Sequence, residues 1–556
     1  MTRKQSCQKR STTGCRTCRF VDICTLNSIF QPTNVINRAR RVKCDETPGT
    51  CKRCKDSGWK CEGYDFARLS NLRKEDRGIM SSLTLYRASQ GLPGVGPEEK
   101  RGFAFFQHLS IPNLTGFFNT SLWTNLILPM SHEEPAVTHA LVAVSVLHED
   151  MEVRGVPLVR EDLACRRHRF ALGQYGRSLA ILNKRRHSQD PKFREVVLTC
   201  CYLFVAFDLM RGRYDPAMRH LKQGLAIIEE AHSWESPEMV STRSPPIAKP
   251  LQIALTRFRD HSYFFGLNPN RSAIGDQAPL SEYGFSTLYD ARNALDDVVR
   301  GLIVLMIAEK QLATDDHGAD RLVALFKMKR DIKRQFNQYK TRLDYSESHS
   351  LHIQDQKDLR GLKILRLHHL NYDLVLESVL VEDDRSLLIS HVDGFRQILD
   401  LCEQIANSFQ DKSGSHSRPS LVLEMGVNAS LFFVFWKCHD FSLRLRALTL
   451  LEEWPHREGP WDSRRLVTFA KQTLDLEFDM LASSSDPQAP MRLEISSLEV
   501  RDDKMESVIE YNIRGQSQEV LGQRRVVLLD EEASGDSTLS FCLRTQRYIH
   551  SINSAC

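Results

Sequence analysis

Residues 38–61 read RARRVKCDETPGTCKRCKDSGWKC, so four cysteines alternate with basic residues in a short stretch. Two further cysteines, Cys15 and Cys18, lie upstream. In a reducing compartment, cysteines at such short spacings are more often metal ligands than disulfide partners. The arginines and lysines between them favour a polyanion as the partner. We therefore expect a small metal-built module that holds cationic side chains against DNA.

The charge distribution along the 556-residue chain supports this interpretation. Residues 1–75 hold 17 Lys and Arg against 7 Asp and Glu, a balance of +10, whereas the whole chain carries +5 and the remainder therefore −5. A basic head on a mildly acidic body indicates nucleic acid as the partner of the head. A solvated basic tail is the alternative, and the interleaved cysteines argue against it. Residues 38–43 would also serve as a nuclear-import signal.

The cysteine spacing suits zinc, a tetrahedral ion that prefers thiolates and that a Cys-x2-Cys pair can chelate from one tight turn. Two such pairs are present, and two single cysteines complete the set. Six sulfurs can hold two four-coordinate zinc ions if two of them bridge the ions. One four-cysteine site with two spare thiols is the alternative. The candidate zinc ligands are Cys15, Cys18, Cys44, Cys51, Cys54 and Cys61.

The stretch RRVKCDETPGTCKRCKDSGWKCEGYD resembles the signature of the fungal Zn2Cys6 binuclear-cluster transcription factors from the third cysteine onward. This resemblance implies two zinc ions, bridged by the first and fourth ligands, which are here Cys15 and Cys51. It also implies a nuclear, sequence-specific regulator of RNA polymerase II transcription that binds double-stranded DNA. In the family, two basic residues between the second and third ligands read a CGG triplet, and by position these are Arg40 and Arg41.

The other basic residues near the cysteines suit phosphate rather than base contacts. Arginine and lysine can meet the acceptor edge of guanine in the major groove, whereas phosphate contacts hold the protein in register without reading sequence. A solvent-facing charge without a DNA contact is the alternative for each of them. The expected phosphate contacts are Arg38, Lys43, Lys52 and Arg53.

One departure from the family pattern affects this module. The family places six residues between the second and third cysteines, and here Cys18 and Cys44 are separated by 25. The extra residues, 19–37, read RFVDICTLNSIFQPTNVIN and are mostly apolar and uncharged, unlike their basic surroundings. We interpret them as a translated short intron. The longer loop costs about 1.3 kcal/mol against roughly 10–16 kcal/mol for a structural zinc site, so we expect zinc binding to survive and DNA binding to suffer more.

The remainder of the chain predicts a mainly α architecture with helical-hairpin packing. Apolar residues at helical spacing begin near residue 101 and continue to about 483, with one hairpin formed by 191–211 and 215–228. Further helices are expected near 250–265, 284–313, 320–343, 357–380, 388–408, 420–452 and 462–482. The expected domains are 1–66 for the zinc-cluster DNA-binding domain with the insert at 19–37, 67–100 for a linker, 101–490 for an all-α regulatory domain, and 491–556 for an irregular C-terminal segment that includes candidate short strands.

Two stretches of the body also resemble the helical regulatory region that follows such clusters in the family. They are GFFNTSLWTNLILPMSHEEPAVTHALVAVSVLHE, from residue 116, and LRLRALTLLEEWPHREGPWDS, from residue 443. The resemblance implies a scaffold for regulation, dimerisation or effector sensing, with a small molecule or a protein as effector. The linker has no sustained heptad pattern, so the oligomeric state stays open.

Other function classes are less well supported by the sequence. The N-terminus lacks an apolar signal segment, and no apolar run approaches the roughly 18 residues of a membrane helix, so we expect no membrane partner. No phosphate loop, dinucleotide fingerprint, HExxH pair or nucleophile elbow is present, which argues against an enzyme. A zinc module that contacts protein alone, or a regulator whose DNA binding is impaired by the insert, is the remaining alternative. Target genes, the direction of regulation and the effector are not encoded in any recognisable motif.

Overall fold

Contacts divide the chain into two compact units, Met1–Phe105 and Phe106–Cys556, which are described separately. Both are mainly helical where the structure describes them, which confirms the predicted fold class. The computed structural model describes residues 52–56, 96–118, 121–158, 162–190, 192–233, 247–263, 284–312, 318–381, 388–409, 418–483, 492–501, 506–514 and 520–529.

The described part of the first unit consists of two helices, α2 (Lys52–Asp56) and α4 (Pro97–Phe105). A proline at the first helical position suits the start of α4, because its missing N–H would have no partner there. The carboxylate of Glu99 accepts a hydrogen bond from the backbone N–H of Gly96 at 2.7 Å. A negative charge in the first turn also complements the helix dipole.

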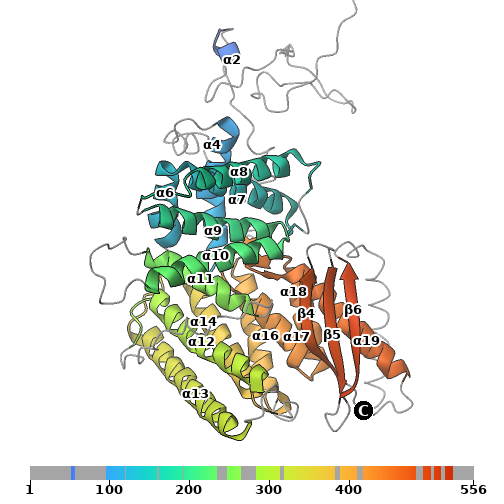
Figure 1. The fold of residues 1–556 in the computed structure, drawn as a ribbon. Coiled ribbons are helices and arrows are strands. Elements are labelled where there is room, and N and C mark those ends of the chain that lie inside the picture. The colour runs from blue at the N-terminus through green and yellow to red at the C-terminus, as the bar shows by residue number, and fades with distance from the viewer. Residues whose placement is uncertain are drawn as a thin grey trace, which may run out of the picture. The chain divides into compact units, whose positions relative to one another are not determined.

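The second unit begins with short helical pieces that lead into a stack of longer helices. In Figure 1, α8 to α11 lie one beside the next, with α7 next to α8 and α9. Both α7 and α9 are buried on nearly every side, since each is apolar over most of its length. The short pieces are η3 (Phe106–Ser110), α5 (Ile111–Leu114), η4 (Leu122–Ile127) and α6 (Leu128–Glu133), and the stack is α7 (Pro135–Arg154), α8 (Arg166–Lys184), α9 (Phe193–Met210), α10 (Tyr214–Ser233) and α11 (Lys249–His261).

The hairpin predicted from the sequence is α9 followed by α10. Gly212 separates the two helices and adopts a φ of 67°, a left-handed conformation that costs glycine little. The Tyr175 ring of α8 stacks on Phe207 of α9 with centroids 4.9 Å apart, and its hydroxyl lies 2.8 Å from Nε2 of His220 on α10. Three successive helices are therefore held together by one aromatic residue as well as by aliphatic packing.

The remaining helices enclose the largest apolar core of the second unit. Its members come from every helix between α12 and α19, and α13 lies along the outer edge of this group in Figure 1. The helices are α12 (Leu288–Leu312), α13 (Gly318–His349), α14 (Gln356–Ser378), α16 (Val392–Asn407), α17 (Asn428–Lys437), α18 (Phe441–Glu453) and α19 (Ser463–Ser483).

The helix expected over 420–452 is wrong as a single element. The chain forms strand β1 (Leu421–Val422) and then two helices, α17 and α18. Residues 426–428 donate their backbone N–H groups to a buried carboxylate, which fixes the start of α17. The side chain of Asp440 accepts from the N–H of Ser442 and Leu443 and caps α18.

Two small sheets complete the second unit. In the first, β1 pairs in parallel with β2 (Arg457–Glu458), which pairs antiparallel with β3 (Trp461–Asp462). The second is an antiparallel meander of β4 (Arg492–Arg501), β5 (Glu506–Arg514) and β6 (Val520–Leu529). The segment expected to be irregular after residue 490 is therefore a sheet over 492–529, as its candidate strands suggested. It contacts α19, where the hydroxyls of Tyr511 and Thr473 lie 2.9 Å apart.

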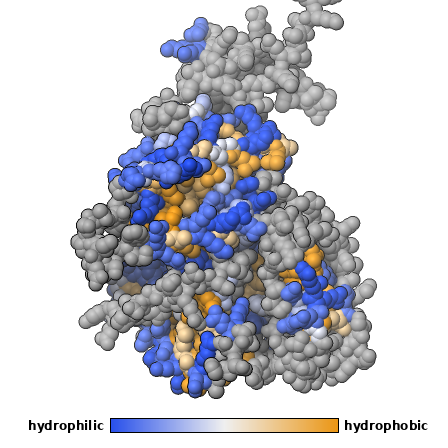
Figure 2. Space-filling view, viewed as in Figure 1, coloured by the Kyte–Doolittle hydropathy of each residue, from blue (hydrophilic) through white to orange (hydrophobic). Residues whose placement is uncertain are grey.

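The surface of the described residues is mostly hydrophilic on the face in view, with apolar residues in separate patches (Figure 2). Among the described helices, none combines the length and the apolar composition needed to cross a membrane.

Candidate nucleic-acid interface and polar centre of the regulatory region

The described part of the cysteine-rich region is the short helix α2. It carries Lys52 and Arg53, two of the expected phosphate contacts, and Cys54, one of the expected zinc ligands. Lys52 and Lys55 are exposed. The helix therefore contains Lys52, Arg53 and Cys54 at consecutive positions.

The other expected site residues lie outside the described residues, as does the predicted insert at 19–37. Their roles stay predictions. They are the expected ligands Cys15, Cys18, Cys44, Cys51 and Cys61 and the expected DNA contacts Arg38, Arg40, Arg41 and Lys43.

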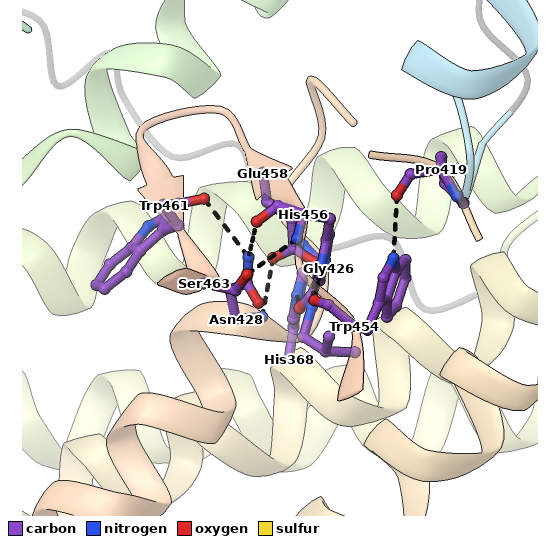
Figure 3. A network of polar contacts seen from close by, with 10 residues as sticks. His368, Pro419, Gly426, Asn428, Trp454, His456, Glu458, Trp461 and Ser463 are labelled. Carbon is purple, nitrogen blue, oxygen red and sulfur yellow. Dashed lines mark hydrogen bonds and ion pairs between the residues drawn. The ribbon is translucent and has the colours of Figure 1, made fainter. Parts of the chain in front are cut away.

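In the second unit, the most elaborate polar arrangement is built on Glu458 of β2, whose side chain is fully buried (Figure 3). Its carboxylate accepts hydrogen bonds from the backbone N–H groups of Gly426, Val427 and Asn428, at 3.1, 2.8 and 2.9 Å. These donors belong to the turn that starts α17, where helix N–H groups lack partners and the helix dipole favours an anion. Glu458 therefore caps a helix that lies thirty residues earlier in the chain.

Aromatic and imidazole rings enclose this carboxylate. Nε2 of His456 lies 2.8 Å from Glu458 Oε1, and the His456 ring stacks on Trp454 with centroids 3.7 Å apart. The indole N–H of Trp454 donates to the carbonyl of Pro419 at 3.0 Å. Nε2 of His368, on α14, lies 2.9 Å from the carbonyl of Gly426. The arrangement ties α14, α17 and the β2–β3 turn together.

A second buried carboxylate, Glu424, lies two residues before Gly426. It accepts from the N–H groups of Phe117 and Phe118, both at 3.2 Å, and from Arg292 of α12 at 2.5 Å. The Arg292 guanidinium also lies 4.3 Å from the centroid of the Phe118 ring. Burial, followed by the neighbouring Arg257, lowers the pKa of Arg292. Glu424 thus joins the first part of the unit to α12.

Both carboxylates connect stretches that resemble the family. Phe117 and Phe118 belong to the stretch that begins at residue 116, and Glu458 belongs to the stretch that begins at residue 443. Both stretches contact residues 423–428. Gly426 is required at this junction, because a Cβ there would lie 2.6 Å from the Phe117 ring and would also meet Glu458 Oε1. Sequence reasoning missed this centre, and the available signal was an acidic residue inside an apolar run, LVLEMGV.

A third polar contact of the centre is the buried ion pair of Arg457 with Asp462, across β2 and β3. Burial opposes ionisation of Asp462, yet the Arg457 charge outweighs it and lowers the pKa of that carboxyl group. Arg457 also donates to the carbonyl of Leu158 at 3.2 Å. The pair therefore connects the small sheet to the end of the α7 region.

A small cavity adjoins Glu424. Its volume is about 40 Å³, enough for a few water molecules. Trp123, Tyr202 and His261 are among its lining residues, and within the described residues none of their polar side-chain atoms makes a hydrogen bond. Burial lowers the pKa of His261 to about 3, so its ring is neutral in the folded protein at neutral pH. The cavity is polar and fits water better than an effector.

Three other histidines of the described residues make ordinary structural contacts or face solvent. His148 contacts Ser110 Oγ at 2.8 Å, and His369 contacts the carbonyl of Phe336 at 3.0 Å. His132 is exposed. Cys438, His439 and Asp440 lie between α17 and α18.

One cluster of potential metal ligands lies elsewhere, at Asp150, Cys165 and His168. Nδ1 of His168 accepts the N–H of Asp162 at 2.6 Å, so Nε2 carries the proton and donates to Asp150 at 3.1 Å. Asp150 also pairs with Arg154 at 2.6 Å. A protonated nitrogen and a neighbouring cation both oppose binding of a divalent metal ion.

Comparison with known proteins finds matches for two segments of the chain. Residues 38–69 match the fungal Zn(2)-Cys(6) binuclear cluster domain, and residues 103–245 match the fungal specific transcription factor domain. The chain is therefore similar, over about a third of its length, to the domains of fungal Zn(2)-Cys(6) transcription regulators. The cluster match begins at Arg38, directly after the predicted insert, and does not reach Cys15 and Cys18.

Curated relatives are fungal regulators as well. The chain is 26% identical over 208 residues to the transcription regulator lscL of Purpureocillium lilacinum, a match that spans 35% of this chain and about half (48%) of that protein. It is 22% identical over 563 aligned positions to the aspercryptin biosynthesis cluster-specific transcription regulator atnN of Emericella nidulans, spanning 82% of this chain and 86% of that one. No solved structure matches the chain significantly. These matches indicate a regulator rather than an enzyme.

Proposed function

We propose that this regulator binds specific DNA sites through a two-zinc cluster and controls transcription by RNA polymerase II in the nucleus. The observation that carries the proposal is the cluster-domain match over 38–69, which contains four of the six expected ligands together with Arg40 and Arg41. The donor set fits zinc, because thiolates at Cys-x2-Cys spacing are its preferred ligands. The two ions would be held by Cys15, Cys18, Cys44, Cys51, Cys54 and Cys61.

In this proposal zinc supplies folding energy and no chemistry on a substrate. The basic residues do the recognition: Arg40 and Arg41 read guanine edges of a CGG-like site, and Arg38, Lys43, Lys52 and Arg53 contact phosphates. The exposed position of Lys52 on α2 supports a phosphate contact. Salt dependence of binding should be steep, because each phosphate contact releases a counterion.

The domain organisation of the proposal follows the sequence: DNA-binding residues 1–66, a linker over 67–100 and a helical regulatory region over 101–490. Residues 19–37 are proposed to be absent from the functional protein, and the start of the cluster match at Arg38 supports this. Sequencing transcripts across codons 18–38 tests it, because a message that always carries these 57 nucleotides contradicts the intron hypothesis.

The regulatory region would transmit a signal through a homodimer contact or an effector. The cavity beside Glu424, at about 40 Å³, is too small for most metabolites, so a small-molecule effector would bind elsewhere. The name of the Emericella relative describes a regulator of one biosynthesis cluster. Similarity over 82% of this chain supports the same kind of role and leaves the target genes open.

The experiment that tests the proposal measures binding of the purified full chain to double-stranded oligonucleotides with and without CGG triplets. Binding that prefers CGG and weakens steeply with salt supports the proposal. A zinc-loaded chain lacking 19–37 that still ignores both DNAs favours the alternative, a zinc module that contacts protein alone.

A further inference from the structure

A groove on the surface of the second unit runs between α13 and the end of α14. Its volume is about 290 Å³, and its lining residues are Phe326, Lys329, Arg330, Lys333, Leu376 and Glu377. Helix α13 lies at the outer edge of its group of helices, so this face is not covered by any other described helix (Figure 1).

Helix α13 exposes apolar side chains at the groove residue Phe326 and at two nearby positions. Val323 is 69% exposed, Phe326 43% and Leu322 36%, all in the first third of α13. Val323, Phe326 and Arg330 follow the i, i+3, i+7 spacing and therefore lie along one side of the helix. Contiguous exposed apolar residues with a polar rim are typical of a docking surface.

Two cations extend from the same part of α13 without partners. Within the described residues, Lys327 and Arg330 are exposed and make neither an ion pair nor a hydrogen bond. The other groove lysines are already engaged: Lys329 donates to the carbonyls of Glu377 and Val379, at 3.0 and 2.7 Å. Lys333 pairs at 2.7 Å with two carboxylates of α14. The free positive charge is therefore concentrated beside Phe326 and Val323.

We propose that this groove, together with the neighbouring exposed residues Val323 and Lys327 of α13, docks an acidic amphipathic helix of a partner protein. An apolar ridge would cover Val323 and Phe326 while flanking carboxylates pair with Lys327 and Arg330, as in helix-in-groove recognition. A second copy of this chain fits less well, because a symmetric contact would bring the same cations face to face. DNA fits less well too, because the apolar side chains of Phe326 and Leu376 and the carboxylate of Glu377 line the groove. The proposal does not depend on which DNA sites the regulator reads.

The test uses the full chain and a fluorescein-labelled synthetic peptide of about 15 residues, long enough for a helix once bound. The peptide carries Leu and Phe at i, i+4, i+7 spacing with Glu at the remaining positions, and fluorescence anisotropy reports binding. Its control has the same composition in scrambled order. We expect the patterned peptide to bind and the scrambled one to bind at least about tenfold more weakly.

Surface variants then locate the site. Phe326→Ser and Arg330→Glu should each weaken peptide binding about tenfold. Lys340→Glu is the matched control, since Lys340 is exposed on the same helix about 15 Å further along, and it should bind like the unaltered protein. Because Val323 is the most exposed of these residues, Val323→Ser supplies the same test should Phe326→Ser lower the melting temperature.

The proposal is overturned if the patterned peptide binds no better than the scrambled one, or if Lys340→Glu weakens binding as much as Arg330→Glu. It is also overturned if Arg330→Glu lowers only the affinity for a double-stranded oligonucleotide, which would make the face a nucleic-acid contact. A dimer that dissociates in Phe326→Ser, measured by analytical ultracentrifugation, would assign the groove to a second copy instead.

Discussion

The cysteine-rich head and the helical body of this regulator are stabilised by different chemistry. Over 38–61 the only large apolar side chains are Val42 and Trp59, too few for a core, so in the proposed zinc cluster the head would depend on metal bonds. The body buries apolar residues from every helix between α12 and α19 and uses two buried carboxylates to fix its turns. Removal of zinc should therefore unfold the head alone, and loss of a buried carboxylate should destabilise the body alone.

Glu458→Ala should have the largest effect on the body. It leaves three backbone N–H groups and the His456 ring without their acceptor, and the loss of one member of such a buried polar set costs about 3–5 kcal/mol. Urea unfolding of the full chain, followed by circular dichroism, measures this loss in the free energy of unfolding. Glu453→Ala is the control, because Glu453 is exposed at the end of α18. Equal losses in the two variants, or loss of zinc from Glu458→Ala, would contradict the comparison of the two regions.

Gly426→Ala should cost somewhat less, about 2–3 kcal/mol, because the new methyl group meets the Phe117 ring and Glu458. The matched control is Gly173→Ala on α8, where an added Cβ meets nothing within 4 Å. That substitution should be neutral or stabilise by up to about 1 kcal/mol, since alanine favours a helix. The two melting temperatures should therefore move apart, and a fall of similar size in both would show that Gly426 is not specially required.

In the head, Arg41→Ala should weaken binding to a CGG-containing oligonucleotide by about 1–3 kcal/mol and relax the preference for it over scrambled DNA. Lys55→Ala is the control, since it removes a charge from α2 outside the predicted contact set. Competition binding with both DNAs measures the ratio of the affinity for CGG-containing DNA to the affinity for scrambled DNA. If Arg41→Ala weakens both DNAs equally, Arg41 contacts phosphate and does not read bases.

A further expected effect concerns how the stability of the body depends on pH. The pKa of His261 is about 3 in the folded protein and near 6.5 when unfolded, so the unfolded state binds more protons between these values. Stability should therefore fall as pH decreases below about 6.5. His261→Gln should reduce this slope in urea midpoints between pH 4.5 and 7.5, with His132→Gln, at an exposed position, as control. An unchanged slope in His261→Gln would show that this ring stays accessible to protons.

Periodicity predicted most helices of the body because their apolar faces recur at helical spacing. It merged β1, α17 and α18 into one helix. The start of α17 depends on Glu458, thirty positions away, which accepts the first N–H groups of that helix, and Asp440 caps α18 after the break. Periodicity left the strands after residue 490 uncertain. Short alternating runs such as SVIEYNIR form strands only when neighbouring strands pair with them.

The site divides in the same way. Zinc ligands and DNA contacts could be proposed from the sequence because cysteine spacing and clustered charge are local signals. The carboxylate centre could not, since nothing near Glu424 indicates that Phe117 and Arg292 will meet it. Zinc ligands and DNA contacts can be predicted from a single segment of sequence. Partners in a buried polar network can be assigned only when the fold is known.

The most direct test of the central claim compares the purified full chain with a variant lacking 19–37, measuring zinc by mass spectrometry and binding of a CGG oligonucleotide by anisotropy. We expect two zinc ions per chain in both, salt-sensitive DNA binding, and tighter binding in the shortened variant. A head without zinc, or a zinc-loaded shortened chain that does not bind DNA, would contradict the assignment.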